Sequence, residues 1–142
     1  MDSNKPDFKI VDHTADLGIM VHGKNLKMLF EAAAKSMMSL MVKAKTTEKT
    51  EVIQLSVEGY DLPDLMVRWL GEILYLFEGE HKLVTNAGVV TISPSHLDAT
   101  LEAVSFNPDL HEILREIKAV TYHQIEVVET AKYWEARIIF DL

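Results

Sequence analysis

Hydrophobic and polar residues alternate near the start of the chain, over residues 16–23. A period of two is typical of a β-strand with one buried face, and Gly23 marks its end. The spacing of apolar residues then lengthens to three and four over residues 26–42, which predicts an amphipathic helix with Asn25 as its N-cap. The apolar positions of this helix are Leu26, Leu29, Phe30, Ala33, Met37, Leu40 and Met41.

The order of a strand and a helix then occurs a second time. After the polar stretch KAKTTEKTE, a strand is predicted around residues 53–57 and ends at Gly59. Asp61 is a suitable N-cap for a second helix, which has Pro63 in its first turn and extends to about Glu78. This helix is apolar around most of its circumference, so we expect it to lie at the centre of the fold.

The rest of the chain is predicted to form strands. Residues 97–103 alternate after the turn SPSH, and FNPDLHE is predicted to form a loop. Two longer strands are predicted over residues 117–127 and 134–141, with His123 on the apolar face of the first. Two helices and about seven strands without regular βαβ alternation indicate an α+β fold with a largely antiparallel sheet. The repeated strand-helix-strand order leaves an internal duplication as an open alternative.

Composition and charge narrow the class of protein. With 142 residues, the chain is expected to form one domain over residues 1–142. It has no apolar run long enough for a membrane span and no secretory signal, so a cytoplasmic location is expected. Since it has no cysteine, any metal would be bound by oxygen or imidazole ligands. The net charge of −8 argues against direct nucleic-acid binding, and it fits either a basic partner protein or simple solubility.

Familiar enzyme signatures are absent from the sequence, including the P-loop, the GxSxG nucleophile elbow and the HExxH zinc motif. The candidates that remain are acids and histidines near predicted strand ends: His13, Asp16, His22, His111, His123 and Asp141. Asp141 directly precedes the terminal carboxylate of Leu142, and an antiparallel pairing of the first and last strands would bring Asp16 beside it. Hard divalent cations prefer such oxygen ligands. In the alternative interpretation, Asp16 binds backbone amides in a turn, the C-terminus is frayed and His123 is a hydrogen-bonded core residue.

Five segments of the sequence together resemble the archease family. They are DHTADLG at 12–18, LFEAAAKSMMSLM at 29–41, DLMVRWLGEILYLFE at 64–78, IKAVTYHQIEV at 117–127 and the final DL at 141–142. The resemblance covers nearly the whole chain in the family's order, and it implies an α+β fold of duplicated strand-helix-strand-strand modules. The sequence departs from the family's usual pattern at EAVSFNPDLH, where many relatives have a Gly-Glu pair, and at Gly71, where asparagine or glutamate is common.

The resemblance also implies a function. Archeases are accessory proteins that activate the GTP-dependent RNA-splicing ligase, which joins RNA 3′-phosphate and 5′-hydroxyl ends in tRNA splicing. A member is expected to promote guanylylation and repeated turnover of the ligase, to meet RNA only through the ligase, and to catalyse no reaction itself. Two alternatives remain open: a metal-dependent hydrolase that uses the same carboxylates, and a general chaperone or adaptor.

Site residues of the family carry over onto matching positions of this chain. The resemblance implies a divalent-metal site formed by Asp16, Asp141 and Leu142, the last through its backbone or its terminal carboxylate. Calcium is the expected cation, with magnesium and manganese as alternatives. The residues for which the resemblance implies supporting roles are His13, His111, Lys118, Tyr122 and His123.

Overall fold

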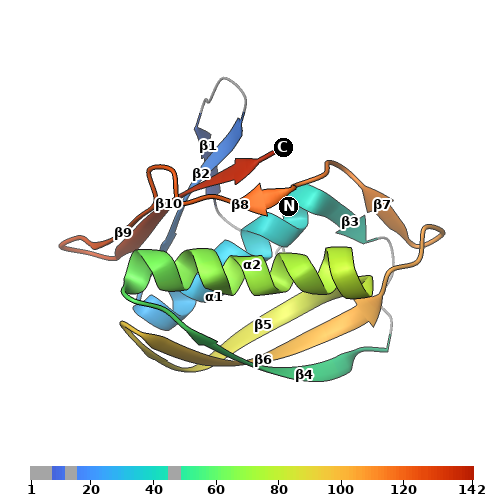
Figure 1. Ribbon diagram of the computed structural model, residues 1–142, viewed down its shortest axis with the longest axis horizontal. Coiled ribbons are helices and arrows are strands. Elements are labelled where there is room, and N and C mark those ends of the chain that lie inside the picture. The colour runs from blue at the N-terminus through green and yellow to red at the C-terminus, as the bar shows by residue number, and fades with distance from the viewer. Residues whose placement is uncertain (1–7, 12–15, 45–48) are drawn as a thin grey trace.

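Two helices and three antiparallel sheets make up the fold (Figure 1). This count refers to residues 8–11, 16–44 and 49–142, which the computed structural model describes. Every strand pairing in these segments is antiparallel. The predicted α+β class is therefore confirmed, whereas the duplication of modules stays a prediction.

The largest sheet has five strands and contains the first and the last strand of the described chain. Its path is β1 (Phe8–Val11), β2 (Asp16–Gly23), β10 (Trp134–Asp141) and β8 (Ala119–Val120), with β9 (Glu126–Glu129) also paired to β10. β2 begins and ends where the alternation predicted. β10 is the predicted last strand, and it lies directly beside β2.

The other two sheets are smaller. The strands of the second are, in order, β4 (Glu51–Glu58), β6 (His96–Ser105) and β5 (Lys82–Ser93), and those of the third are β3 (Val42–Ala44) and β7 (His111–Ile113). β6 buries the alternate residues Leu97, Ala99, Leu101 and Ala103, as its pattern predicted. The sequence pattern missed β1, β3 and β7, because strands of three or four residues are too short to show a period.

Both helices begin at the caps that the sequence predicted. The Asn25 side chain accepts a hydrogen bond from the Met28 N–H (2.9 Å) at the start of α1 (Leu26–Met41). Asp61 accepts one from the Asp64 N–H (2.9 Å) at the start of α2 (Leu62–Glu80). Each cap satisfies a backbone donor that has no partner inside the helix.

The helices lie between the five-stranded and three-stranded sheets (Figure 1). Both helices contact strands of both sheets, so their apolar surfaces are covered on more than one side. At the centre, Trp69 of α2 is fully buried, and its indole N–H donates to the carbonyl of Phe30 in α1 (2.9 Å). The predicted central position of the second helix is confirmed.

One predicted strand is wrong. Residues 117–127 form β8 and β9 with a turn between them, not one long strand. In this turn Gln124 adopts the left-handed conformation (φ 52°), and the Ile125 N–H donates to the Tyr122 carbonyl (3.3 Å). As a result His123 is exposed at the turn and is not a core residue.

No helix in the described segments is both long enough and apolar enough to cross a membrane.

Candidate functional site

Asp16 and Asp141 face each other across two strands of the largest sheet. Asp16 is the first residue of β2, Asp141 is the last of β10, and the two are register partners. Residues directly opposite in an antiparallel pair have side chains on the same face, with Cβ atoms about 5 Å apart. Asp141 is exposed and Asp16 is partly exposed. The two predicted strand ends therefore meet, and the side chains of Asp16 and Asp141 lie on the same face of the sheet.

The backbone of Asp141 is held from both sides. Its β2 neighbour is Asp16, and on the other side it pairs with Ala119 of β8. The Lys118 N–H donates to the Asp141 carbonyl oxygen (2.8 Å). Leu142 follows and is 41% exposed. Leu142 therefore directly follows a strand end that is held on both sides.

The donor chemistry of this end of the sheet fits a hard divalent cation. Like charges directly opposite on a sheet destabilise it unless a cation or a proton intervenes. Asp16, Asp141 and the backbone or terminal carboxylate of Leu142 would supply only oxygen atoms, which calcium and magnesium prefer. The described residues contain no cluster of three or more acidic, histidine or cysteine side chains suited to a metal. Further ligands would come from backbone or terminal oxygen atoms, or from residues outside the described segments, such as His13.

The Tyr122 side chain contacts the first turn of α2. Its hydroxyl donates to Asp64 Oδ1 (2.7 Å). Asp64 Oδ2 accepts from the Arg68 Nε–H (2.9 Å) and from the Tyr60 backbone N–H (2.9 Å). The hydrogen bond from Tyr122 is the main cause that lowers the pKa of Asp64, and the same bond raises the pKa of Tyr122. Tyr122 therefore fixes the turn after β8 onto α2.

His111 and His123 lie on other elements than the acidic pair, in β7 and in the turn between β8 and β9. His111 lies in the β3–β7 sheet, is 3% exposed, and accepts a hydrogen bond at Nδ1 from the Asn107 N–H (2.9 Å). This bond closes the turn before β7, so His111 has a structural role there. His123 donates its backbone N–H to Thr121 Oγ1 (3.3 Å) in the exposed turn. Lys118, which also has a predicted supporting role, contacts Asp141 through its backbone N–H.

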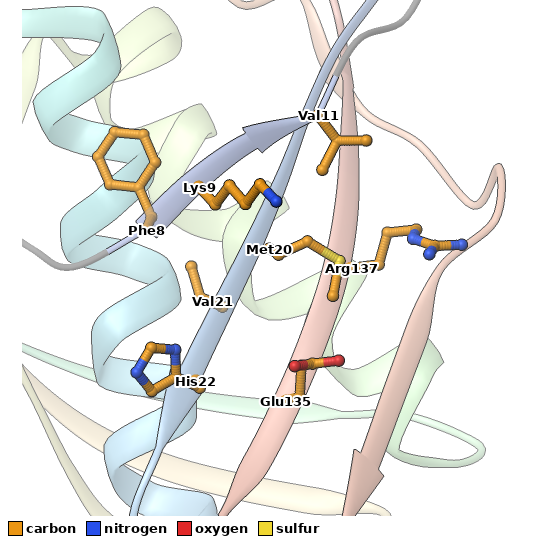
Figure 2. Close-up of a pocket in the computed structure, with 8 residues that line it drawn as sticks. All are labelled: Phe8, Lys9, Val11, Met20, Val21, His22, Glu135 and Arg137. Atoms are coloured by element: carbon orange, nitrogen blue, oxygen red, sulfur yellow. The ribbon is translucent and has the colours of Figure 1, made fainter.

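The face of the sheet that carries the acidic pair also holds a cavity that sequence reasoning missed. Its volume is about 470 Å³. Lys9 and Arg137 are the register partners of Met20 on its two sides, and His22 pairs with Glu135. Figure 2 shows the Lys9 amine directed across β2, and the Arg137 guanidinium pointing away from Lys9. Because both signs of charge line the cavity, its charge alone selects neither a cation nor an anion.

Comparison with known proteins identifies the relatives of this chain. The model of the Archease protein family matches residues 8–142. The chain belongs to the archease family. The archease of Methanosarcina acetivorans is 32% identical over 146 residues, with all of both chains covered. The archease of Pyrococcus furiosus is 34% identical over 136 residues, which cover 92% of this chain and 95% of the relative.

Solved structures agree with the archease fold. The solution structure of Methanobacterium thermoautotrophicum protein 1598 has a TM-score of 0.71 at 29% identity, and covers 95% of this chain and 98% of that one. A crystal structure from Thermotoga maritima, described as an archease and possible chaperone, has a TM-score of 0.63 at 17% identity and covers 94% of this chain and 96% of that one. At that identity the likeness concerns the fold alone. The family predicted from the five segments is thus confirmed.

Proposed function

We propose that this archease is a non-catalytic accessory protein that activates a GTP-dependent RNA-splicing ligase in tRNA splicing. It promotes guanylylation of the ligase and supports repeated turnover. The observation that carries this proposal is the Asp16–Asp141 pair, which faces outward at a strand end of a chain that belongs to the archease family. The chain also lacks the phosphate loop and the serine nucleophile elbow that would indicate chemistry of its own.

The acidic end of the sheet is the part that contacts the ligase in this proposal. Asp16, Asp141 and Leu142, the last through its backbone or its terminal carboxylate, hold a divalent cation, with calcium as the first choice and magnesium or manganese as alternatives. When bound, the cation neutralises the facing carboxylates and supplies a positive centre at the contact. The hydrogen bond from Lys118 and the pairing with β2 keep Asp141 in place. Activation then follows from tighter binding to the ligase conformation that is competent for guanylylation.

In the cell, the archease meets RNA only through the ligase. The net charge of −8 repels phosphate backbones, so direct RNA binding by the archease is disfavoured.

The test measures guanylylation and RNA joining with limiting cognate ligase. Wild-type protein is compared with Asp16→Ala and Asp141→Ala, each checked for folding by circular dichroism. Asp109→Ala is the matched control, because Asp109 is exposed in the turn before β7 and its removal changes the net charge equally. We expect wild type and the control to stimulate the ligase. Each site variant should stimulate guanylylation about tenfold less, which is equivalent to about 1.4 kcal/mol. Full stimulation by a folded Asp16→Ala variant would contradict the proposal.

Further measurements distinguish this function from the two alternatives, a hydrolase and a general chaperone or adaptor. A metal-dependent hydrolase would turn over a phosphate ester with cation present and ligase absent. A general chaperone or adaptor would lose stability in the site variants while stimulation at equal folded concentration stayed unchanged.

A further inference from the structure

An open groove lies between the edge strand β4 and helix α2, well apart in sequence from the acidic pair. Its volume is about 540 Å³. It is lined by residues 56–58 of β4, by Arg68, Gly71 and Glu72 of α2, and by His96 of β6. We refer to it as the Gly71 groove.

Gly71 has no packing reason to be glycine. It lies in the middle of α2, where glycine costs about 1 kcal/mol relative to alanine. A Cβ atom added there would meet no other atom within 4 Å, and Gly71 does not have a positive φ. Gly79 of the same helix is different, because a Cβ there would lie 2.7 Å from the Tyr75 ring. Because Gly71 has no side chain, another molecule can approach the backbone of α2 closely at this position.

The charges in the Gly71 groove favour a cationic occupant. Glu58 and Glu72 form no salt bridge within the described part of the chain. Arg68 is the lining cation, and its charge is balanced by Asp64, which accepts from Nε at 2.9 Å. Among the described residues, the groove is therefore lined by two exposed carboxylates that form no salt bridge. An ammonium or guanidinium group bound beside either of them would form one.

His96 does not change this balance. Its Nε2 lies 3.1 Å from Asp98 Oδ1, and Asp98 also accepts hydrogen bonds from the hydroxyls of Ser56 and Thr91. Any positive charge on His96 is thus matched by its own carboxylate partner.

The rim of the groove has the residue types that dominate protein interfaces. Tyr60 is 89% exposed, and the Arg68 guanidinium lies 5.8 Å from the centre of its ring. Asp64 holds both, through the Tyr60 backbone N–H and the Arg68 Nε–H. Tyrosine and arginine are the residue types that contribute most binding energy at protein interfaces, and the Arg68 side chain, already held by Asp64, loses less conformational entropy on binding.

We infer that the Gly71 groove receives a lysine or arginine side chain of the partner protein, with Tyr60 and Arg68 packing against the surface around it. This inference rests on the proposed function, in which the partner is the RNA-splicing ligase. An enzyme that holds RNA presents a basic surface, and this chain has a net charge of −8. Charge complementarity therefore selects a basic protein side chain over RNA as the occupant.

The test compares two double variants with the same change of net charge. Glu58→Lys with Glu72→Lys reverses the groove, whereas Glu102→Lys with Glu112→Lys reverses two exposed acids on β6 and β7. The dissociation constant for the cognate ligase is measured by calorimetry, together with stimulation of guanylylation. We expect the groove variant to bind about tenfold or more weakly, and the control to change by less than about threefold, the part due to general steering. Equal weakening of both variants would overturn the inference.

A second pair of variants excludes misfolding as the cause. Gly71→Ala and Gly71→Lys both improve helix propensity, but only lysine puts a long cationic side chain at the groove. We expect the lysine variant to bind the ligase about tenfold more weakly and the alanine variant to bind as wild type does. Binding without stimulation by wild type would contradict the proposed function alone. Stimulation with unchanged binding of Gly71→Lys would contradict the groove alone, and absence of wild-type binding would contradict both.

Discussion

Replacing Asp16 by asparagine is expected to have opposite effects on stability without and with a divalent cation. Without one, the register of β2 and β10 places the Cβ atoms of the acidic residues Asp16 and Asp141 about 5 Å apart, and we take the same separation for their charges. At that distance the repulsion is about 0.8 kcal/mol in a water-like dielectric, which applies because both residues are accessible to solvent. In a chelator, Asp16→Asn is therefore expected to be more stable than wild type by up to about 0.8 kcal/mol.

A bound cation reverses the order. At a cation concentration one hundred times the dissociation constant, wild type gains about 2.7 kcal/mol. If the asparagine variant binds about a hundredfold more weakly, its gain at the same concentration falls to about 0.4 kcal/mol. The free energy of unfolding of wild type then exceeds that of the variant by about 1.5 kcal/mol, after the repulsion between the two carboxylates is subtracted. For a chain of this size, the gain of wild type corresponds to a rise in Tm of about 10 °C.

The assay is thermal unfolding in chelator, calcium, magnesium and manganese, followed by circular dichroism. Asp109→Asn is the control, since it removes an exposed carboxylate from a turn outside this sheet. Its Tm should respond to the cation as wild type does. If the difference in Tm between wild type and Asp16→Asn were the same in all four solutions, the acidic pair would not be a cation site.

Three further predictions concern α2 and its contacts. Trp69→Phe removes a buried hydrogen bond to Phe30 and part of a fully buried ring, so urea unfolding should show a loss of about 2–4 kcal/mol, and a loss below about 1 kcal/mol would contradict the packing. Gly71→Ala should raise the stability by about 0.5–1 kcal/mol in the same assay, because nothing obstructs the new methyl group. Because the pKa of Tyr122 is raised, its hydrogen bond contributes fully to the free energy of unfolding below about pH 10, and this contribution is lost as pH rises through the folded-state pKa. The lowered pKa of Asp64 means that its contribution is present above about pH 4 and is lost in acid. Asp64→Asn should shift the ultraviolet titration of Tyr122 to lower pH, with Tyr122→Phe identifying its signal.

Local signals along the chain were sufficient to predict β2 and both helices. Asn25 and Asp61 were recognisable as caps because a cap and the helix it starts lie within a few residues of each other. For β2 and the helices, the determining residues belonged to the periodic pattern or lay directly beside it. The meeting of Asp16 and Asp141 was only a conditional expectation, because antiparallel neighbours place the start of one strand opposite the end of the other only if β2 and β10 pair, as they do in the structure.

The turn after β8 could not be predicted in the same way. Its residues continue the alternation of a strand, but Thr121 donates both its backbone N–H (3.0 Å) and its hydroxyl (2.8 Å) to the Ile139 carbonyl. Tyr122 then binds Asp64, which is 58 residues away in the sequence. Contacts of this kind join separate elements, and no periodicity within one segment indicates them. The exposed position of His123 is a consequence of these tertiary contacts.

The same tertiary contacts connect the acidic pair with the groove. Asp141 is held by the Lys118 amide, and the chain then passes through β8 to Tyr122, which binds Asp64 and through it Arg68 at the groove. The two proposed contacts thus lie on one hydrogen-bonded frame but share no residue, so their effects should be separable. Loss of the groove removes binding energy that is equal in all ligase states, and should raise the protein concentration needed for half-maximal stimulation. Loss of the acidic pair removes the preference for one ligase state, and should lower the maximal stimulation instead. A variant altered at both places should show the two effects together, and the product of the single effects is the value expected for independent sites.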